Sequence, residues 1–504
     1  MKTRRPIDHR AGRRAALALV ALLALLAASC SSSADGSPSA EFERRGRLAL
    51  TDPAVDAGDS VLPTLTPRAE LTPADDGEVH VTYAPEVPPP ITRSDQRVFD
   101  VALEVLEGRC PLDPAGGVDT EMWGYRIAGD VDVACGSPGP VIRGRVGDLA
   151  RITLTNPAEN VRAHNIDFHS VTGQGGGAAD LTVAPGETAT IEVRLLYPGT
   201  FMYHCAFGDV PMHIAHGMYG MFIVDPEESL PEADHEWAVM QSEWYVGEAV
   251  DGLAPYDPVA LLAEEPRYVT FNGRTDALTG DRALRMAVGE RARIHFVNEG
   301  LNLASNWHPI GSHWDVVYPE AATHPANRVI RGSQSTLVVA GGGTVTELVG
   351  IVPSTVILVD HALVRTFAKG AIGQIVVEGP ENPEVFSVGR AAPDPVTGEV
   401  EVPAGDVVAM PAGAWNPVNA ATAYTPGELR VALGATVTWR NDDSVIHTVT
   451  SGASTGTVTT PDGLFDSGDL QPGESFSFTF DEPGTFDYFC TPHPWMVGRI
   501  VVEA

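Results

Sequence analysis

Lysine is almost missing from this chain of 504 residues, and acidic side chains outnumber basic ones by two to one. The only lysines are Lys2 and Lys369, and the 66 acidic and 33 basic residues give a formal net charge of −33. Phosphate backbones are bound by clustered Lys and Arg, so this deficit argues against nucleic acid as a partner. A large negative charge is more simply explained by solubility or salt adaptation.

Long apolar runs are also missing beyond the N-terminus, so no later segment is predicted to cross a membrane. Cysteine is scarce, with five residues, whereas Gly (51) and Pro (40) are abundant and aromatic and β-branched residues recur in short runs. This composition favours β-sandwiches over helical bundles. The length predicts two to four domains.

The first residues have the pattern of an export signal. An Arg-rich start precedes an apolar stretch over 15–28 that is too short to span a bilayer. Small residues then lead to Cys30, as in bacterial lipoprotein signals, so we expect a signal peptide over 1–29 and lipidation of Cys30, with ordinary secretion as the alternative. Residues 30–82, rich in Ser, Pro, Ala and Asp, predict a flexible tether. The protein is expected to be exported and lipid-anchored on the outer face of a bacterial cell membrane.

The rest of the chain repeats itself three times. In each copy, apolar and polar residues alternate as in a half-buried strand, over 147–156, 289–298 and 434–441. A second element follows: residues 198–205 and 483–490 match almost letter for letter, whereas the middle copy, 353–360, ends in Asp360 where the others carry Cys. These repeats predict three tandem all-β sandwich domains, with boundaries near 226 and 390.

Four potential metal ligands lie in the first copy. His164, Cys205, His213 and Met218 supply two imidazoles, a thiolate and a thioether, which is the ligand set of a blue-copper (type 1) electron-transfer site. The plain alternative is a buried Cys among core histidines, but four such ligands would then have to fall at this spacing by chance.

The third copy repeats this ligand set. His447, Cys490, His493 and Met496 have the same chemistry, and the last three lie in the short segment 490–496. We therefore predict a second type 1 copper site in a domain that has no histidines for a catalytic centre.

His204 is adjacent to Cys205 but cannot bind the same metal, because successive side chains of a strand point to opposite faces. His204, His169 and His361 form a separate trio without a thiolate. Three imidazoles with an open position describe a catalytic metal centre, although each histidine alone is better explained by a core or surface role. Adjacent Cα atoms are about 3.8 Å apart, so two coppers joined through this peptide bond could pass an electron from one site to a substrate at the other.

Cys110 and Cys135 have no ligand-like surroundings. In an oxidising compartment we expect them to form a disulfide. Two free thiols are the alternative.

Several segments resemble the copper-containing nitrite reductases, in particular the lipoprotein branch with a short loop between the Cys and the second type 1 His. The resemblance covers about 83–385, and the tail from 396 to 504 instead resembles a plastocyanin- or amicyanin-type cupredoxin that most of the family lacks. The matching segments are 84–89, 164–169, 172–179, 216–220, 359–361 and 369–374.

The resemblance implies three cupredoxin-like Greek-key domains, which we place at 83–226, 227–390 and 396–504. It also implies a homotrimer with catalytic (type 2) copper at each subunit interface, where His169 and His204 come from one subunit and His361 from its neighbour. The implied reaction is the one-electron reduction of nitrite to nitric oxide and water.

This reaction consumes two protons, and the resemblance assigns them to Asp167 and His308. Groups of intermediate pKa suit proton delivery, and burial near a metal can bring both towards working pH. Ile310 matches an apolar residue that crowds the nitrite pocket. His313 is at most an accessory proton group, and His216 either touches the donor surface or faces solvent.

The extra third domain is expected to be a tethered electron donor or relay, because linkage raises the local concentration of the donor. The resemblance further implies an external donor such as a cytochrome c or a cupredoxin, and a dissimilatory-type role in denitrification or in detoxification.

Two other functions remain open from the residues alone. A multicopper oxidase would need several His-x-His pairs, and the chain has none. A non-enzymatic copper electron-transfer lipoprotein would have blue sites but no open copper centre.

Overall fold

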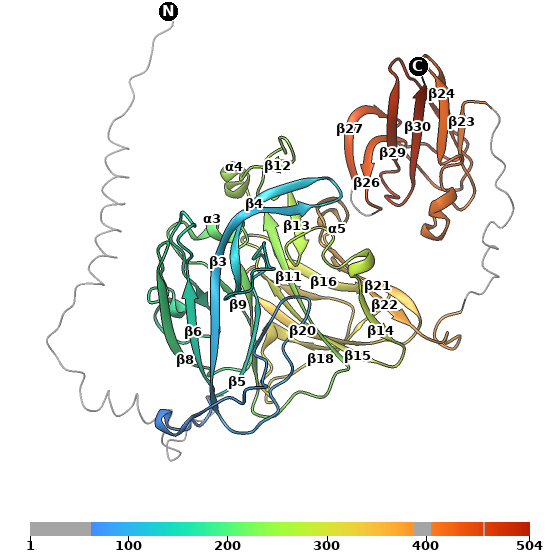
Figure 1. The fold of residues 1–504 in the computed structure, drawn as a ribbon. Coiled ribbons are helices and arrows are strands. Elements are labelled where there is room, and N and C mark those ends of the chain that lie inside the picture. Colours follow the sequence, from blue (N-terminus) through green and yellow to red (C-terminus); the bar gives the residue numbers. More distant parts are fainter. Residues whose placement is uncertain (1–61, 388–404, 457–458, 504) are drawn as a thin grey trace, which may run out of the picture. The chain divides into compact units, whose positions relative to one another are not determined.

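The computed structural model describes residues 62–387, 405–456 and 459–503. The predicted signal peptide, Cys30 and the tether up to residue 61 lie outside the described residues, as do the first residues of the predicted third domain. Strands in the described part form six sheets, which pair into three sandwiches (Figure 1). None of the helices in these residues has the length and apolar character that a bilayer crossing requires.

The first sandwich closes around a buried apolar core. Its sheets have the orders β12-β4-β3-β6-β8, with β1 on β3, and β2-β5-β10-β9-β7. Three strands of this sandwich lie outside the predicted range of 83–226. Strands β1 and β2 precede residue 83, and β12 follows residue 226, where the chain returns and pairs in parallel with β4. The strands are β1 (Thr72–Pro73), β2 (Val81–Thr82), β3 (Arg97–Asp113), β4 (Val118–Ile127), β5 (Val141–Arg145), β6 (Leu149–Thr155), β7 (Asp167–Phe168), β8 (Thr188–Arg194), β9 (Gly199–His204), β10 (Tyr219–Asp225) and β12 (Leu253–Ala254).

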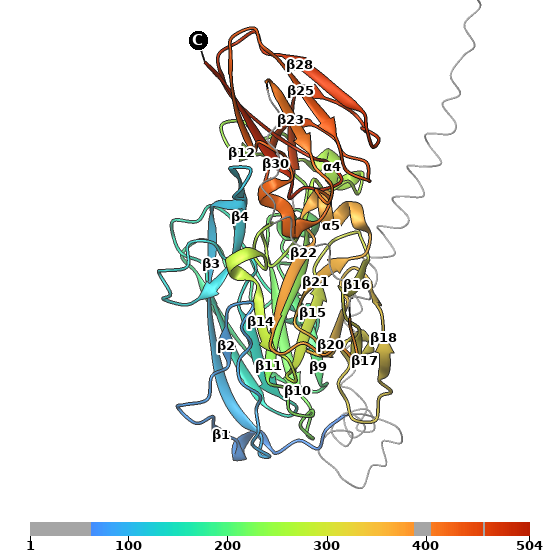
Figure 2. The same ribbon diagram turned by 90° about the vertical axis from the view of Figure 1, so that its right-hand side faces the viewer.

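The second sandwich has the sheet orders β13-β11-β15-β20-β17-β18 and β14-β22-β21-β16-β19. The neighbouring strands β14, β22 and β21 can be followed in Figure 2. The strands are β11 (His235–Trp244), β13 (Tyr268–Phe271), β14 (Leu284–Ala287), β15 (Arg291–Asn298), β16 (Ser305–Ile310), β17 (Trp314–Tyr318), β18 (Ile330–Ser333), β19 (Thr336–Val338), β20 (Gly343–Val349), β21 (Ser354–Asp360) and β22 (Ile372–Glu378).

The third sandwich is smaller and has its own core around the fully buried Trp439. Its sheets have the orders β23-β25-β28 and β24-β30-β29-β26-β27. The strands are β23 (Val407–Met410), β24 (Glu428–Ala432), β25 (Thr436–Asn441), β26 (Thr450–Ser454), β27 (Thr459–Asp466), β28 (Ser475–Thr479), β29 (Gly484–Phe489) and β30 (Val497–Glu503).

Helices are short and lie in the connections. Two of them matter for function, because α3 carries one potential ligand and α5 follows another. The helices are α3 (Val210–Ala215), α4 (Pro258–Leu262) and α5 (Leu363–Lys369), and the 3₁₀ turns are η1 (Arg68–Glu70), η2 (Gln174–Gly177), η3 (Gly280–Arg282), η4 (Pro319–Ala321) and η5 (Pro417–Thr422).

The Asn that ends each repeated strand pattern has the same structural role in all three sandwiches. Asn156, Asn298 and Asn441 are fully buried. Each Nδ2 donates 2.8 Å hydrogen bonds to a carbonyl of the following loop, at residues 162, 303 and 445 respectively. A second bond reaches a carbonyl of another segment, at residues 183, 338 and 470. The Asn therefore fixes the loop that leads, in the first and third copies, to the first potential metal ligand.

The first and second sandwiches share a buried interface. Apolar side chains of β10 and β11 belong to one joint cluster. At its edge, buried Arg143 forms ion pairs with Asp225 (2.8 Å) and with Glu236 (2.5 Å), and Arg293 is a second cation for Glu236 (2.7 Å). Paired charges avoid the free-energy cost of an isolated buried ion, so this network holds the two domains in a defined relation.

Candidate metal centres

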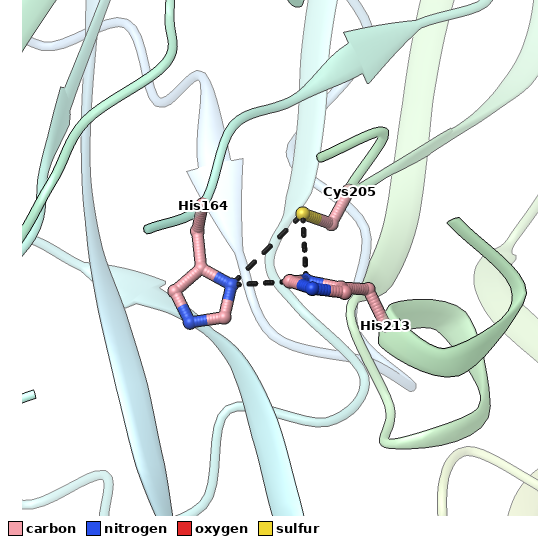
Figure 3. Close-up of side chains that lie close together, drawn as sticks. All are labelled: His164, Cys205 and His213. Carbon is pink, nitrogen blue, oxygen red and sulfur yellow. Dashed lines mark hydrogen bonds between the residues drawn. The ribbon is translucent and has the colours of Figure 1, made fainter. Parts of the chain in front are cut away.

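Three side chains of the first sandwich converge on one point (Figure 3). Cys205 Sγ lies 3.2 Å from His213 Nδ1 and 3.9 Å from His164 Nδ1, and the two nitrogens are 3.2 Å apart. His164 is placed by the bridge to Val183, Cys205 by the end of β9, and His213 by α3. Met218 is fully buried in the same core, and its carbonyl accepts a hydrogen bond from the Cys205 amide (3.1 Å).

The donor chemistry of this cluster fits a soft metal ion. Burial lowers the pKa of His164, and burial together with the nearby His164 lowers the pKa of His213 to about 4, so both imidazoles are neutral ligands at pH 7. Burial raises the pKa of the Cys205 thiol. A bound cation would reverse that effect, because coordination deprotonates a thiol outright.

The third sandwich repeats this geometry. Cys490 Sγ lies 3.6 Å from His447 Nδ1 and 3.5 Å from His493 Nδ1, which are 3.1 Å from each other. Met496 is fully buried, and its carbonyl accepts from the Cys490 amide at 3.1 Å, as Met218 does from Cys205. The histidines and cysteines predicted as ligands of both thiolate sites are therefore brought together, with the two methionines buried next to them in the chain fold.

A second cluster in the first sandwich has no thiolate. Potential ligand atoms of Asp167, His169 and His204 lie within 4.8 Å of one another, and His169 Nε2 is 3.2 Å from His204 Nε2. Asp167 and His204 face each other across β7 and β9. His204 is the last residue of β9, so its imidazole contacts His169 while the next residue, Cys205, contacts His213.

His361 does not join this cluster in a single chain. It lies exposed directly after β21, with its ring centroid 5.0 Å from that of His308 on β16. His308 Nδ1 donates to the Gln334 carbonyl (2.5 Å), which leaves Nε2 available. In the single chain, His169 and His204 therefore form one group, and His308 and His361 form another.

The remaining sequence candidates fall in different surroundings. Ile310 lies two residues after His308 on β16, hence on the same face, and is half-buried. His313 is exposed. His216 does not face solvent: it is 5% exposed, stacks on Trp123 with ring centroids 3.8 Å apart and bonds the Met212 carbonyl at 2.7 Å. The solvent-facing interpretation of His216 is therefore wrong. Cys110 and Cys135 are bonded as a disulfide.

The second sandwich has an ion pair where the others have ligands. Ser305 pairs with Val338 as His164 pairs with Val183 and as His447 pairs with Leu470, so Ser305 takes the place of the first imidazole. Asp360, fully buried, takes the place of the Cys and pairs with Arg365 Nε at 2.9 Å. Asp360 also accepts from the Asn306 and Ala362 amides, both at 3.1 Å.

Sequence reasoning missed the carboxylates behind the thiolate sites. Glu107 Oε1 lies 3.1 Å from His164 Nε2, and Asp443 Oδ2 lies 2.9 Å from His447 Nε2. Asp443 precedes His447 by only four residues, so its role could have been predicted from the sequence. Glu107 lies 57 residues from His164, and no local sequence pattern indicates that the two are in contact.

Tandem sandwiches with thiolate and histidine sites define a class of multidomain copper oxidoreductases. Known proteins agree with that class: the plastocyanin/azurin family of copper binding proteins matches residues 415–503, and the multicopper oxidase family matches residues 130–229.

The relatives narrow the assignment further. Copper-containing nitrite reductase from Neisseria meningitidis serogroup A is 42% identical over 308 residues, which cover 61% of this chain and 76% of the relative. The enzyme of the same name from Pseudomonas chlororaphis is 34% identical, over 62% of this chain and 88% of its own. The chain belongs to the copper-containing nitrite reductase family, and copper is its metal.

One solved relative is copper nitrite reductase from Nitrosomonas europaea, with a TM-score of 0.49 at 34% identity, over 57% of this chain and 96% of that chain. Another is the copper-containing nitrite reductase from Thermus scotoductus, with a TM-score of 0.48 at 24% identity, over 81% of this chain and 99% of that chain.

Proposed function

We propose that this protein is a nitrite reductase in which nitrite, two protons and one electron give nitric oxide and water. The observation that carries the proposal is the contact pattern of two consecutive residues. Cys205 is in the buried thiolate cluster, and His204 is in the half-exposed cluster with Asp167 and His169. One peptide bond therefore connects an electron-transfer site to a site that a substrate can reach.

Each cluster suits one part of the reaction. Copper held by His164, Cys205, His213 and Met218 would supply a one-electron couple. Copper at the type 2 site of His169, His204 and His361 would supply a position where nitrite binds. The fully buried thiolate cluster excludes solvent, whereas exposed His169 leaves the other cluster accessible. The C-terminal site is assigned to His447, Cys490, His493 and Met496.

Protons are delivered from Asp167 and His308. Asp167 lies among the ligand atoms of His169 and His204, so its carboxylate is within reach of a nitrite oxygen bound there. His308 lies beside His361 with Nδ1 bound to the Gln334 carbonyl, and this bond keeps Nε2 directed away from the backbone. Ile310 limits the pocket on the side of His308, and His313 stays at most an accessory group.

The complete site requires a homotrimer. His361 is exposed and apart from His169 and His204, and three apolar side chains of α5 next to it are exposed: Leu363 (41%), Val364 (70%) and Phe367 (42%). Burying such side chains between subunits is favourable, and the same contact would bring His361 to a neighbour's His169 and His204.

The remaining parts serve location and electron supply. We assign 1–29 to a signal peptide, Cys30 to a lipid anchor outside the cytoplasm, and 83–226, 227–390 and 396–504 to three domains, of which the first also includes strands β1, β2 and β12 from outside its range. The C-terminal domain relays electrons from an external donor such as a cytochrome c or a cupredoxin, and the reaction is of the dissimilatory type, in denitrification or in detoxification.

The decisive experiment measures nitric oxide formed from nitrite by the purified, copper-loaded protein with a reduced dye. Electron paramagnetic resonance on the same sample should show a normal, non-blue cupric signal that nitrite perturbs. A protein with blue signals alone and no nitric oxide would be an electron carrier. Oxygen reduction is not favoured, because a three-copper cluster needs His-x-His pairs, which the sequence lacks.

A further inference from the structure

The two thiolate sites share an outer carboxylate but differ in what surrounds it. In both, the first imidazole uses Nδ1 for the cluster and Nε2 for a carboxylate: Glu107 Oε1 at 3.1 Å from His164 and Asp443 Oδ2 at 2.9 Å from His447. Both carboxylates are buried, with side chains 9% and 0% exposed. Each therefore puts an anion at a fixed distance behind the metal site.

In the first domain, this anion has a cation beside it. Arg162 Nη1 pairs with Glu107 Oε2 at 2.9 Å, and the Arg162 amide donates to Oε1 at 3.0 Å. The Arg162 guanidinium carbon also lies 4.2 Å from the centre of the Trp123 ring, which is in edge contact with His164 and His213. The Arg162 side chain is 37% exposed, so water partly screens its charge. Its contacts with Glu107 and Trp123 nevertheless hold that positive charge next to the site, where it offsets the charge of Glu107.

Two further acidic groups near that site are weaker influences. Glu121 contacts Arg162 at 3.3 Å and Asp209 precedes α3, but both are exposed to water, which screens their charge.

In the C-terminal domain, the buried anion is held by neutral groups. Asp443 accepts hydrogen bonds from the amides of Gly413 (2.9 Å), Ser444 (2.7 Å) and Trp415 (3.0 Å). No Lys or Arg pairs with Asp443 among the described residues. Asp469 is a further carboxylate near Cys490, but it is exposed, so water screens its charge as it screens those of Glu121 and Asp209. The surroundings of this site are therefore more negative than those of the first site.

The exposure of the two thiolate sites to solvent also favours the oxidised state at the C-terminal site. His164, Cys205 and His213 are all buried, whereas His493 is half-buried. Water stabilises the higher charge of an ion more than protein does, so the C-terminal site favours the oxidised state for this reason too.

We propose that Arg162 and Asp443 set the potentials of the two blue-copper sites in opposite directions, so that electrons move from the C-terminal site to the first-domain site. Reduction removes one positive charge from the ion. A fixed anion therefore lowers the reduction potential and a fixed cation raises it. The inference rests on the proposed function and adds the residues that set the direction of its electron relay.

The transfer would need no other reactant. Copper held by His447, Cys490, His493 and Met496 would give up one electron as Cu(I), and copper held by His164, Cys205, His213 and Met218 would accept that electron as Cu(II). No proton moves. Arg162 and Asp443 are positioning residues here, since each acts through the histidine side of its site.

The order of potentials can be measured in the full-length, copper-loaded protein. Cys490→Ser leaves only the first-domain blue site and Cys205→Ser only the C-terminal one, so the blue absorption of each variant can be titrated anaerobically against redox dyes. We expect the C-terminal site to have the lower reduction potential. The equilibrium constant for electron transfer to the first-domain site should be about ten or more, which corresponds to a difference of about 59 mV for one electron. Equal or reversed potentials would overturn the inference.

Charge variants test the cause. In the Cys490→Ser background, Arg162→Gln should lower the reduction potential of the first-domain site by about 59 mV, which is a tenfold change in the Cu(II)/Cu(I) equilibrium constant. Arg162→Lys keeps the positive charge and should lower the potential less. Arg151→Gln is the matched control, because Arg151 forms only a surface pair with Asp100 and Glu192 in the same domain, and it should not shift the potential. An unchanged potential in Arg162→Gln contradicts the role of Arg162.

The C-terminal site has its own pair of variants. In the Cys205→Ser background, Asp443→Asn should raise the potential. Because Asp443 also holds three backbone amides, exposed Asp469→Asn provides a second, milder test that should raise the potential by a smaller step. No rise in either variant contradicts the role of the acidic surroundings.

Dye-driven nitric oxide formation separates this inference from the proposed function. Nitric oxide production with reversed potentials refutes the direction of the relay and leaves the reductase intact. Absence of nitric oxide from the wild-type protein refutes the reductase, and the two potentials then still decide whether the charges act as proposed.

Discussion

The rings of His308 and His361 lie edge to face with centroids 5.0 Å apart, on the paired strands β16 and β21 or directly after them. Neither ring is in the cluster of Asp167, His169 and His204. The proposed catalytic site, which uses both pairs of histidines, would therefore be assembled from two copies of the chain.

Complementation between inactive variants tests this assembly. His204→Ala and His361→Ala should each abolish nitrite reduction, because each removes one ligand from every interface. Trimers refolded or co-expressed from a mixture should regain about a quarter of wild-type activity, since that share of interfaces joins two intact halves. Native mass spectrometry reports the trimer, and mixtures without regained activity would place all ligands in one subunit.

Asp167 should act in catalysis without affecting the blue site. Asp167→Asn removes a proton donor from the open cluster and should reduce dye-driven turnover by about 10²–10⁴-fold. The blue absorption should stay, because the Cys205 cluster does not include Asp167. Asp180→Asn, at an exposed position after η2, is the control and should keep full activity. Full activity in Asp167→Asn would remove Asp167 from the proton path.

The C-terminal domain should matter only for electron supply. Cys490→Ser should slow turnover with a protein donor by roughly tenfold or more, because the tethered carrier is lost. Turnover with a small reduced dye should not change, since the dye can reach the first-domain site. Parallel steady-state assays with both donors measure the difference. Equal rates with the protein donor before and after the substitution would exclude a relay.

The interface between the first two domains should make stability depend on acid pH. Burial alone would raise the pKa of Glu236, but His295, Arg143 and Arg293 outweigh burial and hold it far below the ordinary value of 4.5. The stabilisation is then fully present above about pH 4.5 and is lost as the pH falls through the lowered pKa.

Thermal melting of Glu236→Gln at several pH values measures this contribution. At pH 7 the variant should be less stable by about 3–5 kcal/mol, because Arg143 and Arg293 lose their shared partner. The deficit should narrow as the pH falls below 4.5. Glu248→Gln, which breaks an exposed pair with Arg267, should melt like wild type at every pH. If Glu236→Gln were less stable than wild type by the same amount at every pH, the lost stability would be due to packing and not to charge.

Three of the four ligands in each set could be predicted from the sequence because they are close along the chain, whereas His164 and His447 lie 41 and 43 residues before the Cys of their sets. Cys205, His213 and Met218 belong to one loop, and Cys490 to Met496 is shorter still. Strand alternation then separates His204 from Cys205 without any tertiary information. The threefold repeat of the sandwich was visible for the same reason, since each copy carries its own strand pattern.

Features that depend on distant segments could not be predicted. Arg162 and Glu107 meet because β3 runs beside the loop before β7, and no local pattern encodes that approach. The stacking of His216 on Trp123 joins α3 to β4 in the same way and explains why exposure was misjudged. Strand β12 adds to the first sandwich after the chain has entered the second, so a boundary drawn from repeats alone misses it.

The ion pair of Asp360 with Arg365 has a consequence for maturation. Both partners of this salt bridge are side chains of the protein itself, so the buried site of the second sandwich is complete without copper. The middle sandwich can thus close without copper. In the proposed trimer, the imidazole at position 361 would then be in place before any copper arrives, and oligomer formation would precede metal loading.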